Sequence, residues 1–253
     1  KFFISGISIA ILIAFKFTPL IIFPPIFLYV FRTQNFSIKR SLINVNWENS
    51  INFVSGFILW QAPFIFFTGL NAYIENLKLA LLNGYLSGNS MNIGWVITKF
   101  RMGSNSLPRY EEDSELIKFI YVDVHSGLYQ GMKITAMTLI ILIVIRSLKM
   151  ENSIKNTSLL CSLSIYVYYI FAPGVHENHL TLAIPFCIIL IDKFNLSATI
   201  IGILVGNLSL INLLAIYGLN GRYNEQRNLF GIDYTFFISL FEIFLALVIL
   251  IFY

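Results

Sequence analysis

Residues 174–179 (GVHENH) bring one carboxylate and two imidazoles close together, at Glu177, His176 and His179. The stretch lies between two apolar runs that have the composition of membrane-spanning segments. Polar and charged groups near hydrocarbon lose hydration, which is unfavourable unless they serve a purpose there. The arrangement therefore predicts side chains that act at the membrane boundary. A simpler interpretation stays open, above all for His179 and for His125 elsewhere in the chain: a histidine at the end of a span is only solvated.

Two kinds of hydrolytic site fit these residues poorly. The helical zinc-protease motif needs two histidines four residues apart with a glutamate between them, whereas His176 and His179 are three apart, and no cysteine nearby completes a ligand set. We therefore predict no metal site and no cofactor, and leave open whether a divalent cation assists. Ser126 directly follows His125, but adjacent residues rarely face each other and no nucleophile elbow is present, which argues against an acyl-transfer triad.

The phosphate of a membrane lipid is the ligand that we expect instead. A phosphate at headgroup depth needs cations or N–H donors at the same depth, and His176 and Lys16 are the predicted contacts. For Lys16 the alternative is a lysine that only snorkels toward the interface. Supporting roles are predicted for residues in the same stretch or in loops on the same side of the membrane: Glu177, His179, Arg109 and Arg222, with Arg227 near the last.

The composition indicates the elements that position these groups. Hydrophobic residues make up 57% of the 253 residues and charged residues only 12%, against about a quarter in a soluble domain. The mean hydropathy of +0.76 places the chain in a membrane. The net charge of +4 comes from scattered basic residues, which excludes a nucleic-acid partner. Cys161 and Cys187 both lie in apolar runs and are interpreted as small apolar side chains rather than a disulfide or a metal pair.

Apolar runs predict an all-α fold, a polytopic transmembrane helical bundle of about 7–8 spans, since a crossing needs about 20 residues. The first run, 2–31, is too long for one crossing, and KFTP at 16–19 and PP at 24–25 interrupt it. We expect two short or kinked helices that meet near Lys16. Further spans are expected at 51–68, 128–147, 157–172, 178–192, 195–217 and 234–253. Residues 1–253 are interpreted as a single transmembrane domain, the C-terminal part of a longer protein, with an extracytoplasmic loop at 69–127.

The connecting segments alternate in charge and so predict the orientation. Those at 32–50, 146–156 and 192–193 are short and basic, whereas those at 69–127, 172–179 and 217–233 carry most of the acidic residues and all three histidines. The positive-inside rule places the first group in the cytoplasm and the second outside.

The long loop at 69–127 has structure of its own. Apolar residues at helical spacing between 73 and 86 predict an amphipathic helix along the outer surface. Gly84, Gly88, Asn89 and Gly94 predict turns before Trp95.

Three short motifs, at 6–24, 84–95 and 171–177, resemble segments of the GT-C superfamily of polytopic glycosyltransferases in the same order along the chain. GISIA at 6–10 followed by KFTPLIIFP at 16–24 resembles a helix pair of these enzymes, in which a Lys precedes Pro-Leu, further aliphatic residues and a second Pro. FAPGVHE at 171–177 resembles the Val-His-Glu-Lys segment of the dolichyl-phosphate-glucose glucosyltransferases of the endoplasmic reticulum and the His-Glu-Arg segment of prokaryotic mannosyltransferases. Residues 84–95, ending in NIGW, are similar to a lumenal segment of those glucosyltransferases. The chain departs from the pattern at Asn178, where Lys or Arg follows His-Glu in the family, and at 92–93.

The resemblance implies a function and roles for residues. A polyprenyl- or dolichyl-phosphate sugar donates a hexose to a glycan, lipid or protein acceptor on the extracytoplasmic or lumenal face of the endoplasmic reticulum or a prokaryotic plasma membrane. An aspartate in the first extracytoplasmic loop acts as general base; we expect it N-terminal to this chain, so the catalytic residue is unknown. His176 would contact the leaving phosphate, Lys16 would be a second contact, and Glu177 would orient His176 or a helix end.

Other functions remain possible from the sequence. An O-antigen ligase or polymerase also uses a histidine-bearing outer loop, but takes an oligosaccharide diphosphate donor and carries a longer arginine-rich loop. A transporter with inverted repeats fits the broken helices at Pro19 and at 24–25. Against transport, no second half mirrors the first, and the ionisable residues are expected at the outer edge of the membrane rather than its middle. A non-enzymatic subunit of a larger membrane complex is a further alternative.

Overall fold

The computed structural model describes residues 1–15, 18–32, 45–81, 84–88, 90–102, 122–176, 178–191, 196–217, 228–229 and 232–252. The chain forms two compact units: unit 1 comprises 1–82 and 142–161, and unit 2 comprises 83–141 and 162–253. These units lie within the range that the sequence predicted as a single transmembrane domain. The helices α6 (Gly127–Ser147) and α7 (Ile154–Phe171) each contribute residues to both units.

Unit 1 begins with the interrupted helix that the sequence predicted. The chain runs through α1 (Phe2–Phe15), the short 3₁₀ helix η1 (Thr18–Ile22) and α2 (Phe23–Phe31). Pro24 and Pro25 occupy the first turn of α2, where a missing N–H leaves no hydrogen bond unmade, so they start this helix rather than break one. Lys16, at the interruption itself, lies outside the described residues.

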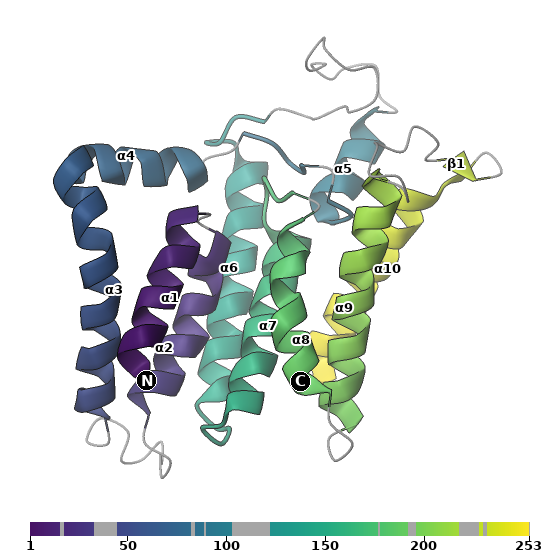
Figure 1. Cartoon of the computed structure of the whole chain (residues 1–253). Coiled ribbons are helices and arrows are strands. Elements are labelled where there is room, and N and C mark those ends of the chain that lie inside the picture. The colour runs from purple at the N-terminus through teal and green to yellow at the C-terminus, as the bar shows by residue number, and fades with distance from the viewer. Residues whose placement is uncertain are drawn as a thin grey trace. The chain divides into compact units, whose positions relative to one another are not determined.

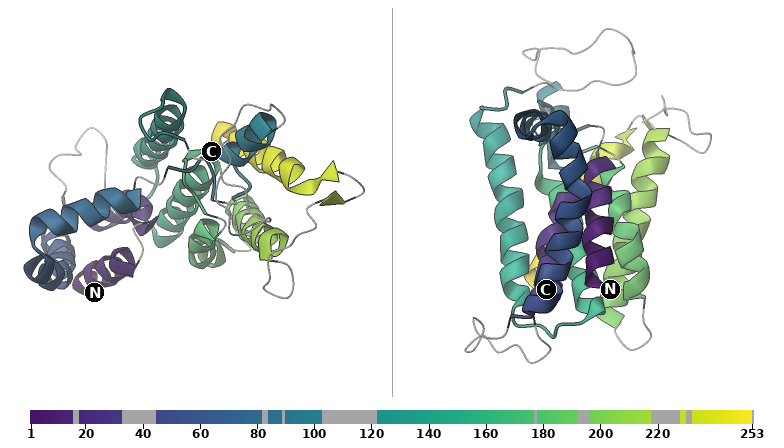
Figure 2. Two further views of the ribbon diagram at one scale, coloured as in Figure 1. Left: turned by 90° about the horizontal axis from the view of Figure 1, so that it is seen from above. Right: turned by 60° about the vertical axis from the view of Figure 1, so that its left-hand side comes forward.

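The helices α1 and α3 (Trp47–Thr68) pack closely in unit 1 (Figures 1 and 2). Gly6 and Gly56 make this contact possible. A Cβ atom on Gly6 would lie 2.0 Å from the main-chain oxygen of Phe53, and one on Gly56 would lie 2.1 Å from that of Phe3. Small residues at such positions let two helix backbones approach in a membrane, where packing rather than water exclusion holds helices together.

The helix α4 (Leu70–Leu81) confirms the amphipathic helix predicted after α3, starting three residues earlier than the sequence indicated. Gly69 separates the two helices with a left-handed φ of 78°. As a result α4 turns away from α3 and lies across its end (Figures 1 and 2). The hydroxyl of Tyr73 donates to Oε1 of Gln61 on α3 at 3.1 Å, and burial raises the pKa of Tyr73, so the donor proton is retained.

At the other end of unit 1, Arg32 links the end of α2 to the segment that follows α6. Its guanidinium donates to the main-chain oxygens of Ser147 at 3.0 Å and Met150 at 2.8 Å, and the amide of Asn152 donates to the oxygens of Tyr29 and Arg32. The end of α2 therefore lies against the connection between α6 and α7. Both segments were predicted to lie on the same, basic side of the membrane, and this pairing agrees with that prediction.

Unit 2 contains α5 (Ile93–Met102), most of α6 and α7, the 3₁₀ helix η3 (His179–Ala183), α8 (Ile184–Leu190), α9 (Leu196–Tyr217) and α10 (Tyr234–Phe252). In all views α9 and α10 lie next to each other (Figures 1 and 2). The only strands in the described ranges, β1 (Asn228–Leu229) and β2 (Ile232–Asp233), form a two-residue antiparallel pair just before α10. The architecture is thus helical, as predicted.

Four helices of the described part are long and apolar enough to cross a membrane: α3, α6, α9 and α10. Shorter apolar helices cover Phe2–Ala14, Leu20–Phe31 and His179–Leu190. The predicted total of 7–8 spans is therefore not confirmed. The segment expected as a span at 178–192 is a 3₁₀ turn followed by the seven residues of α8. The boundaries expected for the last two spans agree with α9 and α10 within one residue.

The segment predicted as an outer loop at 69–127 contains a second helix, α5, that the sequence did not indicate. Gly94, expected in a turn, lies in the first turn of α5, and a Cβ atom there would lie 2.1 Å from the main-chain oxygen of Leu86. Met91 and Trp95 are buried. This part of the segment packs into unit 2 instead of lying on its surface.

Candidate functional site

The GVHENH stretch leaves α7 through a tight turn. The helix ends at Phe171, two residues before Pro173, which disfavours the helical conformation for Ala172. Gly174 has φ 69°, a left-handed conformation that glycine adopts without steric cost. The turn directs Val175 and His176 toward a second segment of unit 2, residues 84–92.

The two segments meet through main-chain hydrogen bonds. The N–H of Gly88 donates to the oxygen of Val175 at 2.7 Å, and Gly88 and His176 form an isolated parallel bridge. The hydroxyl of Ser90 donates to the same Val175 oxygen. The Ser87 hydroxyl makes two hydrogen bonds with the main chain of Ser90: it accepts from the Ser90 N–H at 3.0 Å and donates to the Ser90 oxygen at 2.9 Å. The backbone at His176 is therefore fixed from one side by a rigid, buried loop.

The side chain of His176 is half-buried and lies over Gly88. A Cβ atom at position 88 would lie 2.5 Å from Nδ1 of His176 and 2.8 Å from its Cε1. A side chain at position 88 would therefore have to displace the imidazole or the backbone that carries it. A partly exposed imidazole held against backbone is suited to donate a hydrogen bond to a ligand at the end of the bundle.

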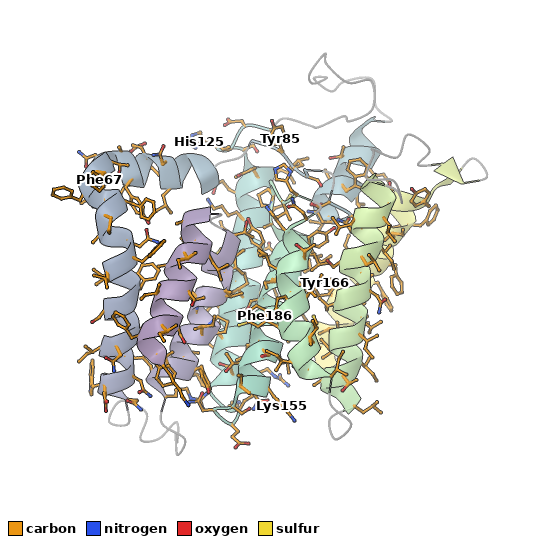
Figure 3. All side chains as sticks on the ribbon, viewed as in Figure 1. Phe67, Tyr85, His125, Lys155, Tyr166 and Phe186 are labelled. Atoms are coloured by element: carbon orange, nitrogen blue, oxygen red, sulfur yellow. The ribbon has the colours of Figure 1, made fainter. Side chains whose placement is uncertain are left out.

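His179 lies next to His176, in an edge-on arrangement with ring centroids 5.5 Å apart. Nδ1 of His179 accepts the main-chain N–H of His176 at 3.3 Å, and its side chain is only 6% exposed. The ring of Tyr168 lies 6.4 Å from it. The His179 side chain is therefore buried and linked to the main chain of His176. His125, by contrast, is exposed near the start of α6 (Figure 3).

A buried polar layer supports this loop from inside the bundle. The N–H of Met91 donates to the Tyr169 hydroxyl at 3.0 Å and to Oδ1 of Asn212 at 3.1 Å. The amide of Asn92 donates to the main-chain oxygen of Tyr169 at 3.0 Å, and its Oδ1 accepts the N–H of Trp95 at 3.0 Å, which caps α5. The loop that holds His176 is thereby tied to both α7 and α9.

Trp95 extends this layer to α10. Its indole N–H donates to the hydroxyl of Thr235 at 3.0 Å, and both side chains are buried. The segments at 84–95 and 172–179 and the adjoining ends of α9 and α10 thus meet at one end of unit 2, as the predicted sidedness of these segments requires.

Of the predicted site residues, the structure brings His176 and His179 together. The others lie outside the described residues: Lys16, Glu177, Arg109 and Arg222, and also Arg227. Within the described ranges, no group of three or more His, Cys, Asp or Glu side chains is arranged to hold a metal ion. Ser126 accepts the N–H of Tyr129 at 3.3 Å and so caps α6. Cys161 and Cys187 are buried free thiols.

Glu242 is the ionisable residue that the sequence analysis missed. It is fully buried in α10, eight residues after Tyr234 and ten before Phe252. The expectation that ionisable residues lie only at the outer edge is therefore wrong for this carboxyl group. The signal was present, since an acidic residue within an otherwise apolar span indicates a functional position by itself.

Comparison of the chain with protein-family models, with curated proteins and with solved structures found no significant match. Four apolar helices of membrane-spanning length identify an integral membrane protein. Its chemistry has to be argued from the site.

Proposed function

We propose that this chain is part of an integral membrane glycosyltransferase, which transfers a hexose from a polyprenyl- or dolichyl-phosphate sugar to an acceptor on the extracytoplasmic face. The observation that carries the proposal is the position of His176: its half-buried imidazole lies over Gly88, and its main-chain N–H donates to Nδ1 of His179. The resemblance of residues 171–177 to the His-Glu segments of GT-C enzymes supports the same assignment.

In the proposed reaction His176 contacts the phosphate that leaves with the lipid. As the bond between the anomeric carbon and the phosphate oxygen breaks, negative charge grows on the phosphate. A fixed imidazole N–H at that oxygen stabilises the charge more strongly near hydrocarbon than in water, because the local dielectric constant is low. His179 positions this donor. Lys16 is the proposed second phosphate contact, and no residue of this chain is assigned as the general base.

Supporting contributions are proposed for Glu177, Arg109 and Arg222, which belong to the same predicted side of the membrane. An arginine presents a planar fork of N–H donors that matches phosphate geometry, so a loop arginine folding over the headgroup would add charge-assisted hydrogen bonds. This contribution would replace the cation that the family carries where this chain has Asn178.

A transporter is the second candidate, because Glu242 removes one objection to it. Transport sites use ionisable groups near the middle of the membrane, within protein rather than facing lipid, and Glu242 is buried near the middle of α10. The position of His176 at the end of the described helices still favours a reaction at a lipid headgroup. A direct assay distinguishes the two candidates, because only the glycosyltransferase releases lipid phosphate.

The test uses the full-length protein in liposomes, supplied with a polyprenyl-phosphate hexose labelled in the sugar and with an extract of membrane glycans, lipids and proteins as the source of the acceptor hydroxyl. Wild type should release the lipid phosphate and form a labelled product. His176→Ala should lower kcat by about 10²–10³-fold, the range for losing one donor to developing charge, whereas the exposed control His125→Ala should retain full turnover. Equal turnover in wild type and His176→Ala would remove His176 from the mechanism. Uptake of the sugar lipid without release of lipid phosphate would support the transporter instead.

A further inference from the structure

Glu242 occupies an unusual position for a carboxyl group. It lies about 12 Å along α10 from Tyr234, at a rise of about 1.5 Å per residue, and no part of it is exposed. In the part of the chain that the structure describes, neither of its carboxylate oxygens has a hydrogen-bond partner. The described ion pairs do not include it either: the one present joins Lys78 and Glu75 on α4.

Among the described residues, no cationic side chain forms an ion pair or a hydrogen bond with the carboxyl group of Glu242. The Tyr166 hydroxyl of α7 reaches the same residue, but donates its proton to the main-chain oxygen of Glu242 at 2.9 Å, not to the carboxylate. Residues 196–216 of α9 contain no ionisable side chain. The helix α5 also packs against α10. The hydrogen bond between these two helices joins Trp95 to Thr235, near the start of α10. The side chains of Lys99 and Arg101 on α5 lie outside the described part of the structure.

Two further hydroxyls at a similar distance from the end of the bundle also have no partner among the described residues: Ser164 on α7 and Ser209 on α9. Both are fully buried. Ser209 lies three residues before Asn212, and Ser164 lies seven before the end of α7 at Phe171. Unpaired buried hydroxyls are unfavourable. Ser164, Ser209 and Glu242 are thus buried polar groups on three helices, each seven or eight residues from the helix end that lies at the end of unit 2 where His176 lies.

Further polar side chains lie between this level and the end of unit 2 where His176 lies, although no described hydrogen bond joins them to Glu242: Ser239 donates to the main-chain oxygen of Thr235 at 2.8 Å. Asn212, Tyr169 and Thr235 make the hydrogen bonds of the layer under the loop at 84–95. One helical turn farther along α10, the buried hydroxyl of Ser239 follows, and Glu242 comes next on the same helix. Hydroxyl and amide groups of this kind accept and donate hydrogen bonds, as a path for proton exchange requires.

We propose that Glu242 is a proton-binding site inside the helices of unit 2, which exchanges its proton with the end of the unit where His176 lies. A carboxylate without a cation or hydrogen-bond donor is far more costly to bury than a neutral carboxylic acid. Binding a proton removes the negative charge of the carboxylate. Release of that proton toward the polar layer would couple the protonation of Glu242 to changes at the end of unit 2 where His176 lies. The site is separate from the proposed phosphate contact and does not depend on it.

The experiment detects the bound proton directly in the full-length protein in liposomes. Dicyclohexylcarbodiimide partitions into membranes and reacts with protonated carboxyl groups. Mass spectrometry should find the adduct on Glu242 at neutral pH, and not on Glu75, which is exposed and paired with Lys78. Above the titration midpoint, labelling of Glu242 should fall about tenfold per pH unit, the response of a single titrating group. Glu242→Gln keeps the shape without the charge and serves as the unlabelled control.

A second readout, infrared absorption, tests both protonation and access. The carbonyl band of a protonated carboxylic acid should be present in wild type, shift in heavy water as the proton exchanges, and be missing in Glu242→Gln. Absence of the band and of the adduct across the pH range would overturn the proposal. Loss of labelling on addition of sodium ions at constant pH would also overturn it, because the carboxyl and the two serine hydroxyls would then form a cation site.

Discussion

Gly88→Ala tests whether the position of His176 matters. The added Cβ atom would lie 2.5 Å from Nδ1 of the imidazole, whereas ordinary van der Waals contact begins at 3.4 Å. The ring must therefore move by about 0.9 Å, or the parallel bridge between the two segments must open. A displacement of about 1 Å in a group that contacts the reacting centre is worth about 100-fold in rate, which corresponds to about 2.7 kcal/mol in the activation free energy.

The assay is transfer from a polyprenyl-phosphate hexose by the full-length Gly88→Ala protein, with kcat and KM measured separately. Gly131→Ala on α6 is the matched control, since a Cβ atom there meets nothing within 4 Å. We expect Gly88→Ala to lower kcat by about 100-fold and the control to leave it unchanged. Modification of His176 by diethylpyrocarbonate should also change in rate, which gives a readout independent of turnover. Normal kcat and normal modification in Gly88→Ala would refute the assignment of His176 to a fixed, functional position.

Three further predictions concern stability and topology. Asn92→Ala removes a cap of α5 and leaves a buried main-chain oxygen without its donor, so unfolding in detergent should become easier by about 2–4 kcal/mol; a melting temperature equal to wild type would contradict the role of this layer. Gly56→Ala places a Cβ atom against the main chain of α1 and should destabilise by about 1–3 kcal/mol, whereas Gly206→Ala, with open space around its Cβ, should cause no loss of stability. Asn178→Cys and Lys149→Cys, both at exposed positions, should react with an impermeant thiol reagent from outside and from the cytosol respectively; reaction of both from the same side would overturn the predicted orientation. The native cysteines are buried and should contribute little background.

Hydrophobic runs predicted the helices well because each long run must satisfy its own backbone in the membrane. The bounds of α9 and α10 follow from this rule alone. The expected span at 178–192 shows its limit: only 182–191 is an unbroken apolar run, and the segment forms a 3₁₀ turn followed by a seven-residue helix with Pro185 near its start. An apolar run predicts an apolar environment, but not the length of the helix that forms there.

The loop that holds His176 was harder to predict for a physical reason. Residues 84–95 contain glycine, serine and asparagine, which indicate a surface turn when the local sequence is considered alone. In the structure Ser87, Ser90 and Asn92 are buried. Several polar groups of this segment find partners far away in the chain: Ser90 at Val175, Met91 at Asn212, and Trp95 at Thr235. Such long-range hydrogen bonds leave no periodic signal in the sequence. The motif at 174–179 indicated where a ligand is expected, but not which segment positions it.

Glu242 and His176 call for different kinds of explanation. An imidazole at the end of a bundle is readily hydrated, so its value depends on what it contacts, and Gly88 and His179 show that its position is controlled. A carboxyl group near the middle of an apolar helix is unfavourable for folding whether or not a ligand is present. Replacing it by an apolar residue of similar size is often neutral or stabilising for a buried charged group. If Glu242→Leu folds with stability equal to or greater than wild type, then the packing of unit 2 does not need this side chain, as expected for a residue kept for the proton that it binds; a large loss of stability would instead assign Glu242 a structural role.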